Sequence, residues 1–322
     1  MPEDDRVQQA CAYLRMLLLR PGDYRARWES HAGSSDTRII DAQAVAAVLG
    51  AFPPGPARRT EVMVGGRRAG AHPVLTRPSE SLFRVARHAL DGTVLHPADL
   101  ELFIRAFGIF GRHAHRLREL RRGSPSVRAI YDDVLPPDEA YRHAGPPHYD
   151  TLALHELHTL GPDGRPAEHE TIQVIKSTVP WLESVPYRFD TDELLVHMVR
   201  GGQVGPSVYR VNETIYGVDI LLNQPLALGE TALLQYHLTF AYKTQPPPRV
   251  RRGVLRSTED LTIWVRFHPT RVPARVWSAR WDSIDDSHII DRQPAELDSE
   301  LSVHVRFGRV EKSIVGFYWE WE

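Results

Sequence analysis

The feature that most constrains the fold is a change in the period of the apolar residues near residue 151. Before this point apolar residues recur every three or four positions, which is typical of one helix face. After it they alternate with polar residues, as in TALLQYHLTFAY at 231–242, which is typical of strands that bury one side. Turn sequences such as PDG and LNQP separate these strands, and no helix pattern intervenes, which argues against a dinucleotide-binding sheet. We therefore predict an α+β protein with an N-terminal α-helical module and a C-terminal antiparallel β-sandwich.

The chain is long enough, at 322 residues, for two domains that each have a core. We expect the helical module to span 1–123 and to include a basic hairpin or loop at 53–78. A proline-rich linker is expected at 124–150, because three proline-bearing clusters interrupt it. The sandwich domain is then expected at 151–322.

Three short helix patterns fall between residues 76 and 123. The first places Leu82, Val85, Ala86 and Ala89 on one face, and the second begins at Pro97, since proline favours the first helical position. The third, at 111–122, carries five arginines. These patterns predict a small cationic helical module.

The sequence HALDGTVLHPADLELFIRAFG within this module resembles the second half of a lambda-repressor-type (XRE-type) helix-turn-helix domain. In that family the recognition helix ends near a glycine, and a helix that starts with proline follows a short loop. The resemblance covers about residues 76–123 and extends to actinobacterial regulator-like proteins with a β-rich C-terminal region. It implies transcription regulation by DNA binding. The candidate DNA-binding residues are those of the helix face opposite the apolar stripe and those in or next to the basic hairpin before it: Ser81, Arg84, Arg87 and His88, and Arg67, Arg68 and Arg77.

One departure from that family is the spacing of the helices. A helix-turn-helix joins its two helices by three or four residues, whereas roughly twenty-five residues separate the Ala-rich helix expected at 41–51 from the helix at 79–90. This spacing suggests that the module has lost DNA binding and serves as a protein-interaction scaffold. The charge pattern leaves both options open. Fourteen arginines face six acids in 53–128, so this segment either binds an anionic partner or packs against the acidic remainder of the chain.

The segment LALHELHTLGPDGRPAEHETIQVI suggests a metal site. A hairpin centred on Asp163-Gly164 sets His158 opposite His169 and puts Glu156 on the same face, which gives a 2-His-1-carboxylate composition. The alternative is that this face is a polar sheet surface exposed to solvent. A one-residue slip of the register destroys the arrangement.

Other chemistry has weaker support in the sequence. No phosphate-binding GxxxxGK[ST] motif and no G-x-S-x-G motif occurs. Trp277 and Trp281 share a strand face and form either an aromatic platform or part of the core. The single cysteine, Cys11, is expected to be a buried small hydrophobe. The N-terminus shows no signal pattern, and no apolar run is long enough for a membrane span, so we expect a cytoplasmic protein.

Three hypotheses follow. The favoured one is a non-enzymatic regulator-like protein whose helical module binds DNA or a protein partner and whose sandwich senses or assembles. The second is the interaction scaffold, and the third is a metal-dependent enzyme that uses the hairpin at 155–169. We predict no cofactor under the first, and DNA, a protein partner or a second copy of the chain, but no membrane, as partners.

Overall fold

The computed structural model describes residues 2–33, 39–52, 79–136, 147–191, 193–282 and 288–322. The chain divides into two compact units, Met1–Arg121 and Arg122–Glu322, and each is described by itself. The predicted basic hairpin at 53–78 lies outside the described residues.

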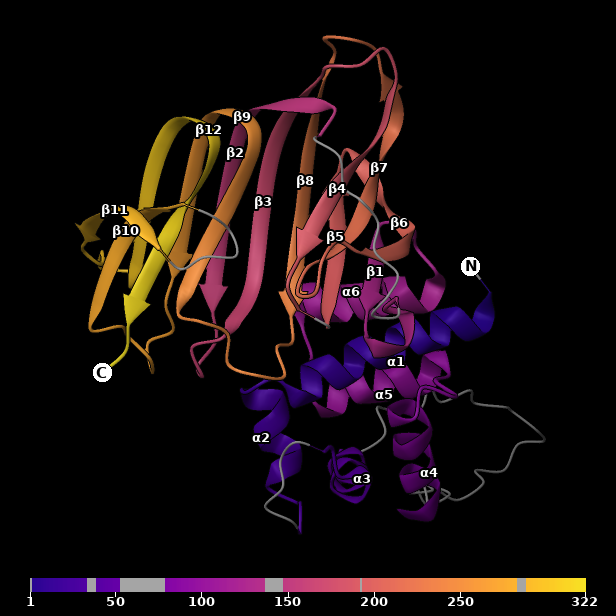
Figure 1. Cartoon of the computed structure of the whole chain (residues 1–322). Coiled ribbons are helices and arrows are strands. Elements are labelled where there is room, and N and C mark those ends of the chain that lie inside the picture. The colour runs from indigo at the N-terminus through magenta and orange to yellow at the C-terminus, as the bar shows by residue number, and fades with distance from the viewer. Residues whose placement is uncertain (1, 34–38, 53–78, 137–146, 192, 283–287) are drawn as a thin grey trace, which may run out of the picture. The chain divides into compact units, whose positions relative to one another are not determined.

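The first unit is helical in its described part (Figure 1). Its elements are α1 (Glu3–Leu19), α2 (Asp23–Glu29), α3 (Ala42–Ala51), α4 (Ser79–Leu90), α5 (Pro97–Ala106) and α6 (Gly111–Arg122). The Asp41 carboxylate accepts from the backbone N–H groups of Gln43 and Ala44, so it caps the first turn of α3. Pro97 opens α5, as predicted.

The sequence pattern missed helix α2, because seven residues are too few to show a helical period. Trp28 on this helix is buried, and its indole Nε1 donates to the carbonyl oxygen of Leu18 at 2.9 Å. Cys11 in α1 is also fully buried, as predicted, and burial raises the pKa of its thiol to about 12.

The second unit is rich in β-strands. After β1 (Val127–Ile130) and a 3-10 turn (Asp132–Val134), its strands are β2 (Tyr149–Leu160), β3 (Pro166–Ser177), β4 (Leu182–Phe189), β5 (Leu194–Arg200), β6 (Gly202–Arg210), β7 (Tyr216–Leu226), β8 (Thr231–Phe240), β9 (Arg249–Arg266), β10 (Arg275–Trp281), β11 (Ile289–Ala295) and β12 (Ser302–Glu320). The predicted α+β class with a helical N-terminal part and a β-rich C-terminal part is therefore shown.

These strands form two sheets. One has nine strands in the order β1-β5-β8-β3-β2-β9-β12-β10-β11, and the other has three in the order β4-β7-β6. Two details differ from the prediction. Val127–Ile130, expected in a linker, pairs with β5 inside the large sheet, and β2 pairs with β9 in parallel rather than antiparallel. Neither long-range pairing leaves a signal in the local sequence pattern.

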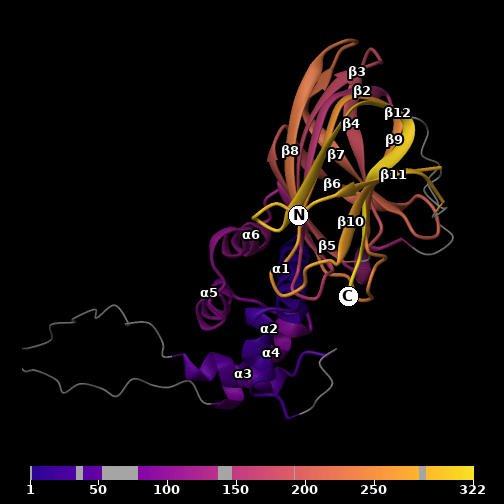
Figure 2. The same ribbon diagram turned by 90° about the vertical axis from the view of Figure 1, so that its left-hand side faces the viewer.

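The core of this unit lies between layers. The three-stranded sheet packs on part of the large sheet, where Tyr187 and Ile220 meet Leu234 and Leu238. Strands β9 and β12 are long and curved, and their pairing shifts register near Gly308 and between Glu311 and Ser313. Such irregularities bend a strand. Figure 1 shows both strands curving at one end, and Figure 2 shows them side by side from a second direction.

This bend turns the large sheet over on itself. Val250 and Phe317 from one half of the bent pair share an apolar cluster with Ile263 and Val303 from the other half. The segment 249–254 of β9 thus belongs to a layer that faces β2 and its neighbours. In the part of the chain that the structure describes, no helix is long and apolar enough to cross a membrane.

Candidate metal centre

The hairpin of β2 and β3 has the register that the sequence predicts. His158 pairs with His169, and Glu156 pairs with Thr171. In the turn, the backbone N–H of Gly161 donates to the carbonyl oxygen of Arg165 at 2.8 Å. Gly164 has φ +78°, a left-handed conformation that glycine adopts without the steric cost of a Cβ. The turn chemistry therefore aligns the two histidines.

The face that carries these residues is interior. Glu156 and His169 are each 4% exposed, and the His158 side chain is 13% exposed. The interpretation of this face as a solvent-exposed polar surface is therefore wrong. The alternation of apolar and polar residues shows which side chains share a face of the hairpin. It does not show what packs on that face, because the segments that do so, β4 and residues 249–254 of β9, are distant in the sequence.

The three side chains bring their donor atoms together. His158 Nε2 lies 3.7 Å from Glu156 Oε2, and His169 Nε2 lies 3.6 Å from Glu156 Oε1. One potential ligand atom from each of the three residues lies within 4.8 Å of the others. Ligands at about 2.0–2.2 Å from a tetrahedral zinc ion are roughly 3.3–3.6 Å apart, so each of the two histidine–carboxylate distances is close to that of a filled site.

The two imidazole rings are stacked. Their centroids are 4.0 Å apart, and their planes differ by 17°. A metal ion binds in the plane of an imidazole, along the Nε2 lone pair, so two stacked rings aim at neighbouring points rather than at one. Binding through both rings therefore requires one of them to turn. His158 is the more exposed of the two, and its Nε2 is buried without a hydrogen-bond partner among the described residues.

The Arg252 guanidinium reaches this cluster from the folded-over part of β9. Its Nη1 donates to Glu156 Oε1 at 3.1 Å. Burial acts to raise the pKa of Glu156, but the charge of Arg252 and the two imidazoles outweigh it and hold that pKa below its ordinary value. The carboxylate is therefore ionised, with one oxygen held by Arg252 and the other facing His158.

His169 and the two phenols near the carboxylate are neutral. Burial lowers the pKa of His169 well below its ordinary value, and the neighbouring His158 adds to the effect. A neutral imidazole is the form that binds metal. Thr171 Oγ1 lies 3.1 Å from His169 Nε2, and burial raises the pKa of Tyr187 and Tyr236, which keeps both phenols protonated.

The sequence pattern predicted one further member of this cluster and missed another. Tyr236 falls on the inward face of a predicted strand, so alternation predicted its burial. Arg252 carried no comparable signal, because its place beside Glu156 depends on the bend of β9.

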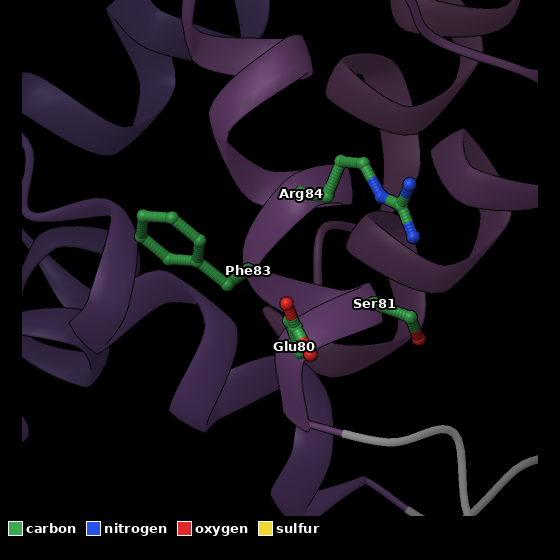
Figure 3. Close-up of a pocket in the computed structure, with 4 residues that line it drawn as sticks. All are labelled: Glu80, Ser81, Phe83 and Arg84. Carbon is green, nitrogen blue, oxygen red and sulfur yellow. The ribbon is translucent and has the colours of Figure 1, made fainter.

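The other candidate residues lie on α4, in the helical unit. Arg84 and Arg87 are exposed, and the Arg87 Nε lies 3.4 Å from Asp91 one turn further along. His88 is partly buried. A hollow of about 390 Å³ is lined by Glu80, Ser81, Phe83 and Arg84. In Figure 3 the side chain of Phe83 points away from that of Arg84. The candidates Arg67, Arg68 and Arg77 lie outside the described residues.

Helices α3 and α4 do not have the spacing of a helix-turn-helix. α3 ends at Ala51 and α4 begins at Ser79, so no three- or four-residue turn joins them. The helix-turn-helix module is therefore not confirmed, and the resemblance on which it depends stays a prediction.

Comparison with known proteins gives a fold-level likeness only. No family model matches this sequence, and no curated protein matches it. Among solved structures, it is similar to a putative protease from Parabacteroides distasonis ATCC 8503, with 9% identity and a TM-score of 0.34 over 53% of this chain. It is also similar to an M1 zinc metallopeptidase from Deinococcus radiodurans, with 13% identity and a TM-score of 0.30 over 52% of this chain. The matched part spans 40% and 42% of those chains.

This comparison corrects the favoured sequence-based hypothesis. We expected a non-enzymatic, DNA-binding transcription regulator, but these similar structures are a putative protease and a zinc metallopeptidase. The amphipathic helices at 79–107 explain the error, because many helical modules have the same spacing of apolar residues. At TM-scores below 0.5 the likeness carries no argument about activity, so the function must be argued from the residues of this chain.

Proposed function

We propose that this protein is a metal-dependent enzyme in which Glu156, His158 and His169 hold a divalent transition metal. The observation that carries the proposal is the meeting of one carboxylate and two imidazoles on adjacent strands, with the buried Nε2 of His158 facing the Glu156 carboxylate at 3.7 Å, beyond ordinary hydrogen-bond distance. A buried polar group without a partner costs about 1–3 kcal/mol. A metal ion between His158 and Glu156 would give both groups a contact at bonding distance.

The surroundings of the cluster strengthen this argument. In the sheet, His169 lies next to Leu238 and His158 next to Val265, both of which are fully buried. Polar groups in such a layer are retained against an energetic cost, and perturbed ionisable groups concentrate at functional sites.

The donor set defines the class of metal. Two nitrogen donors and one carboxylate suit zinc, iron or another first-row ion rather than calcium or magnesium. Three protein ligands leave a coordination position open, and a metal there supplies Lewis acidity and an activated water. Arg252 keeps Glu156 ionised and fixes one carboxylate oxygen, which leaves the other for the metal.

The test is a measurement of metal content by elemental mass spectrometry, with matched histidine variants. We expect about one equivalent of zinc or iron in the wild type, and its loss in His158→Ala and His169→Ala. His155→Ala is the control, because His155 lies on the same strand but is exposed on the opposite face. Metal retained equally by all three variants would rule out this site.

Enzymatic function needs a second measurement. We expect the loaded wild type to hydrolyse at least one member of a panel of chromogenic esters, phosphoesters and peptide amides, and to lose that activity in 1,10-phenanthroline and in His169→Ala. Stoichiometric metal without chelator-sensitive turnover would contradict the enzymatic part of the proposal and leave a structural metal site.

A further inference from the structure

Strand β11 forms one edge of the nine-stranded sheet. Within the described residues it pairs with β10 alone. Its residues 290–294 are all exposed, and Ile290 is 57% exposed. An edge strand presents N–H and C=O groups that can pair with another chain. This edge is therefore available, in backbone terms, to one more strand.

An aromatic pair lies beside this edge, on the face of the sheet opposite the apolar cluster of Val276 and Phe317. Trp277 and Tyr318 are neighbours in the register of β10 and β12, and their rings stack with centroids 4.9 Å apart and planes 11° apart. Trp281 lies four residues further along β10, on the same face of the sheet as Trp277, and is buried. The sequence left open whether Trp277 and Trp281 form a platform or core, and Trp281 belongs to a small buried cluster.

Arginines cover these rings. The guanidinium carbons of Arg275 and Arg292 lie 5.4 Å and 5.8 Å from the Trp277 ring centroid. Arg292 Nη1 also donates to the Tyr318 hydroxyl at 2.9 Å, and Arg251 lies 5.9 Å from the Trp281 ring centroid. A guanidinium held against a ring by a cation–π contact loses less freedom when it binds a carboxylate with two parallel hydrogen bonds.

The charge of this face is positive, and the charge of the reverse face is balanced. The register places four arginines and one glutamate on the aromatic side: Arg249, Arg251, Arg275, Arg292 and Glu320. Arg275 is paired with Glu320 at 2.5 Å. On the reverse side of the same edge, Arg280 stands opposite Asp291. A strand added here therefore meets positive charge on one of its two faces only.

We propose that the edge of β11 binds an extended acidic peptide segment of a partner protein, added as a further strand. Main-chain hydrogen bonds to the edge give affinity. Acidic side chains at every second position fall on the face that carries Arg292 of β11 and, one strand further in, Arg275 of β10. Alternate residues of a strand point to the same face about 6.6 Å apart, so an acid-neutral-acid pattern matches this surface. The proposal is independent of the metal centre.

A second copy of this chain fits the edge less well. Antiparallel pairing of two β11 strands brings the same arginine face from each copy together, and like charges on adjacent strands are destabilising. Pro294 removes one backbone donor from the edge whichever strand is added, so charge is what distinguishes the two occupants. Charge complementarity therefore favours an acidic strand.

The test uses the full chain and a fluorescent decapeptide of alternating glutamate and threonine, followed by fluorescence anisotropy at low salt. Two comparison peptides separate the contributions. One has the same sequence with alternate backbone nitrogens methylated, which prevents strand pairing, and the other has lysine in place of glutamate. We expect the acidic peptide to bind at least about tenfold more tightly than either.

Protein variants locate the site. Arg275→Glu with Arg292→Glu should weaken binding of the acidic peptide about tenfold, because two favourable charges become unfavourable. Arg306→Glu is the control, since Arg306 is an exposed, ion-paired arginine in the other half of β12, bonded to Asp260 at 2.8 Å. Circular dichroism verifies that each variant is folded.

Several results would overturn the proposal. Equal binding of the methylated peptide would show attraction of charge without strand pairing, and equal binding of the lysine peptide would show that charge is not recognised. Equal weakening by Arg306→Glu would show binding elsewhere. Dimerisation in sedimentation that competes with the peptide and is lost in the Arg275/Arg292 variant would assign the edge to a second copy instead.

Discussion

The guanidinium of Arg252 donates to the carboxylate of Glu156 at 3.1 Å across the interior of the β unit, although 96 positions separate them in the sequence. The contact joins the folded-over part of β9 to the hairpin that carries the two histidines. The same contact therefore ties the candidate metal centre to the packing of two layers of the β unit.

Removal of Arg252 tests this coupling. Arg252→Ala leaves the buried Glu156 carboxylate without its main countercharge, and breaking such a pair typically costs about 3–5 kcal/mol. Because the Arg252 side chain is 26% exposed, we expect about 3 kcal/mol in urea unfolding at neutral pH. Arg256→Ala, which removes the more exposed pair with Asp150, should cost less than about 1 kcal/mol. Equal costs for both variants would show that the Glu156 pair contributes no more than a surface pair.

Metal binding should stabilise the β unit. At a free metal concentration of about one hundred times the dissociation constant, binding to the native state adds about 2.7 kcal/mol. We expect zinc to raise the melting temperature of the wild type and of His155→Ala. The same addition should leave His158→Ala unchanged, and a matching rise in that variant would place the metal elsewhere.

The hairpin turn should depend on Gly164. Its φ of +78° strains any residue with a Cβ, and a Cβ there would meet Arg271 Nε at 2.8 Å and the Trp321 ring at 2.9 Å. Gly229 has φ +84° with nothing within 4 Å, so Gly229→Ala meets only the backbone strain, about 1–2 kcal/mol. We expect Gly164→Ala to destabilise the β unit more than Gly229→Ala in urea unfolding. Equal effects would mean that Arg271 and Trp321 move aside freely.

A histidine in the helical unit predicts a pH dependence. Burial lowers the pKa of His113 to about 3, with the charges of Arg20 and Arg116 adding to the effect, and the Tyr13 hydroxyl lies 2.7 Å from its Nδ1. The unfolded chain therefore binds the proton first, near pH 6.5. The stability that His113 contributes is complete above this value and is lost as the pH falls toward 3.

The corresponding experiment follows helix unfolding by circular dichroism between pH 7 and pH 4. His113→Gln should reduce the pH slope of the unfolding free energy by up to about 1.4 kcal/mol per pH unit. His115→Gln is the control, because this side chain on the same helix is 59% exposed. An unchanged slope in His113→Gln would contradict a buried neutral imidazole.

Local sequence patterns predict the hairpin but not its surroundings. Alternation and the turn at Asp163-Gly164 determine which residues pair, so the alignment of His158 with His169 follows from neighbouring residues alone. Which face is buried depends on the bend of β9 and on β4, and both contacts join distant segments. The pattern therefore placed the candidate ligands correctly relative to one another and wrongly relative to solvent.

The helical unit shows the opposite limitation. The preference of proline for the first helical position predicted the start of α5 at Pro97, whereas α2 was too short to produce an apolar period. Amphipathic spacing specifies that helices pack but not what they bind. The hypothesis of a DNA-binding regulator came from the resemblance, the surplus of arginines and the absence of catalytic motifs, and none of these specifies a ligand. It could therefore fail although the helices were predicted correctly.

The separation of Glu156 and Arg252 in the sequence has a consequence in time. A ribosome adds about 5–20 residues per second, so the 96 positions between Glu156 and Arg252 take roughly 5–20 seconds to synthesise. During that interval the hairpin that carries Glu156, His158 and His169 has left or is leaving the ribosome, while the strand that covers it does not yet exist. The nascent chain therefore presents its candidate ligands to the surrounding ions before the arginine that later shields their carboxylate has been made.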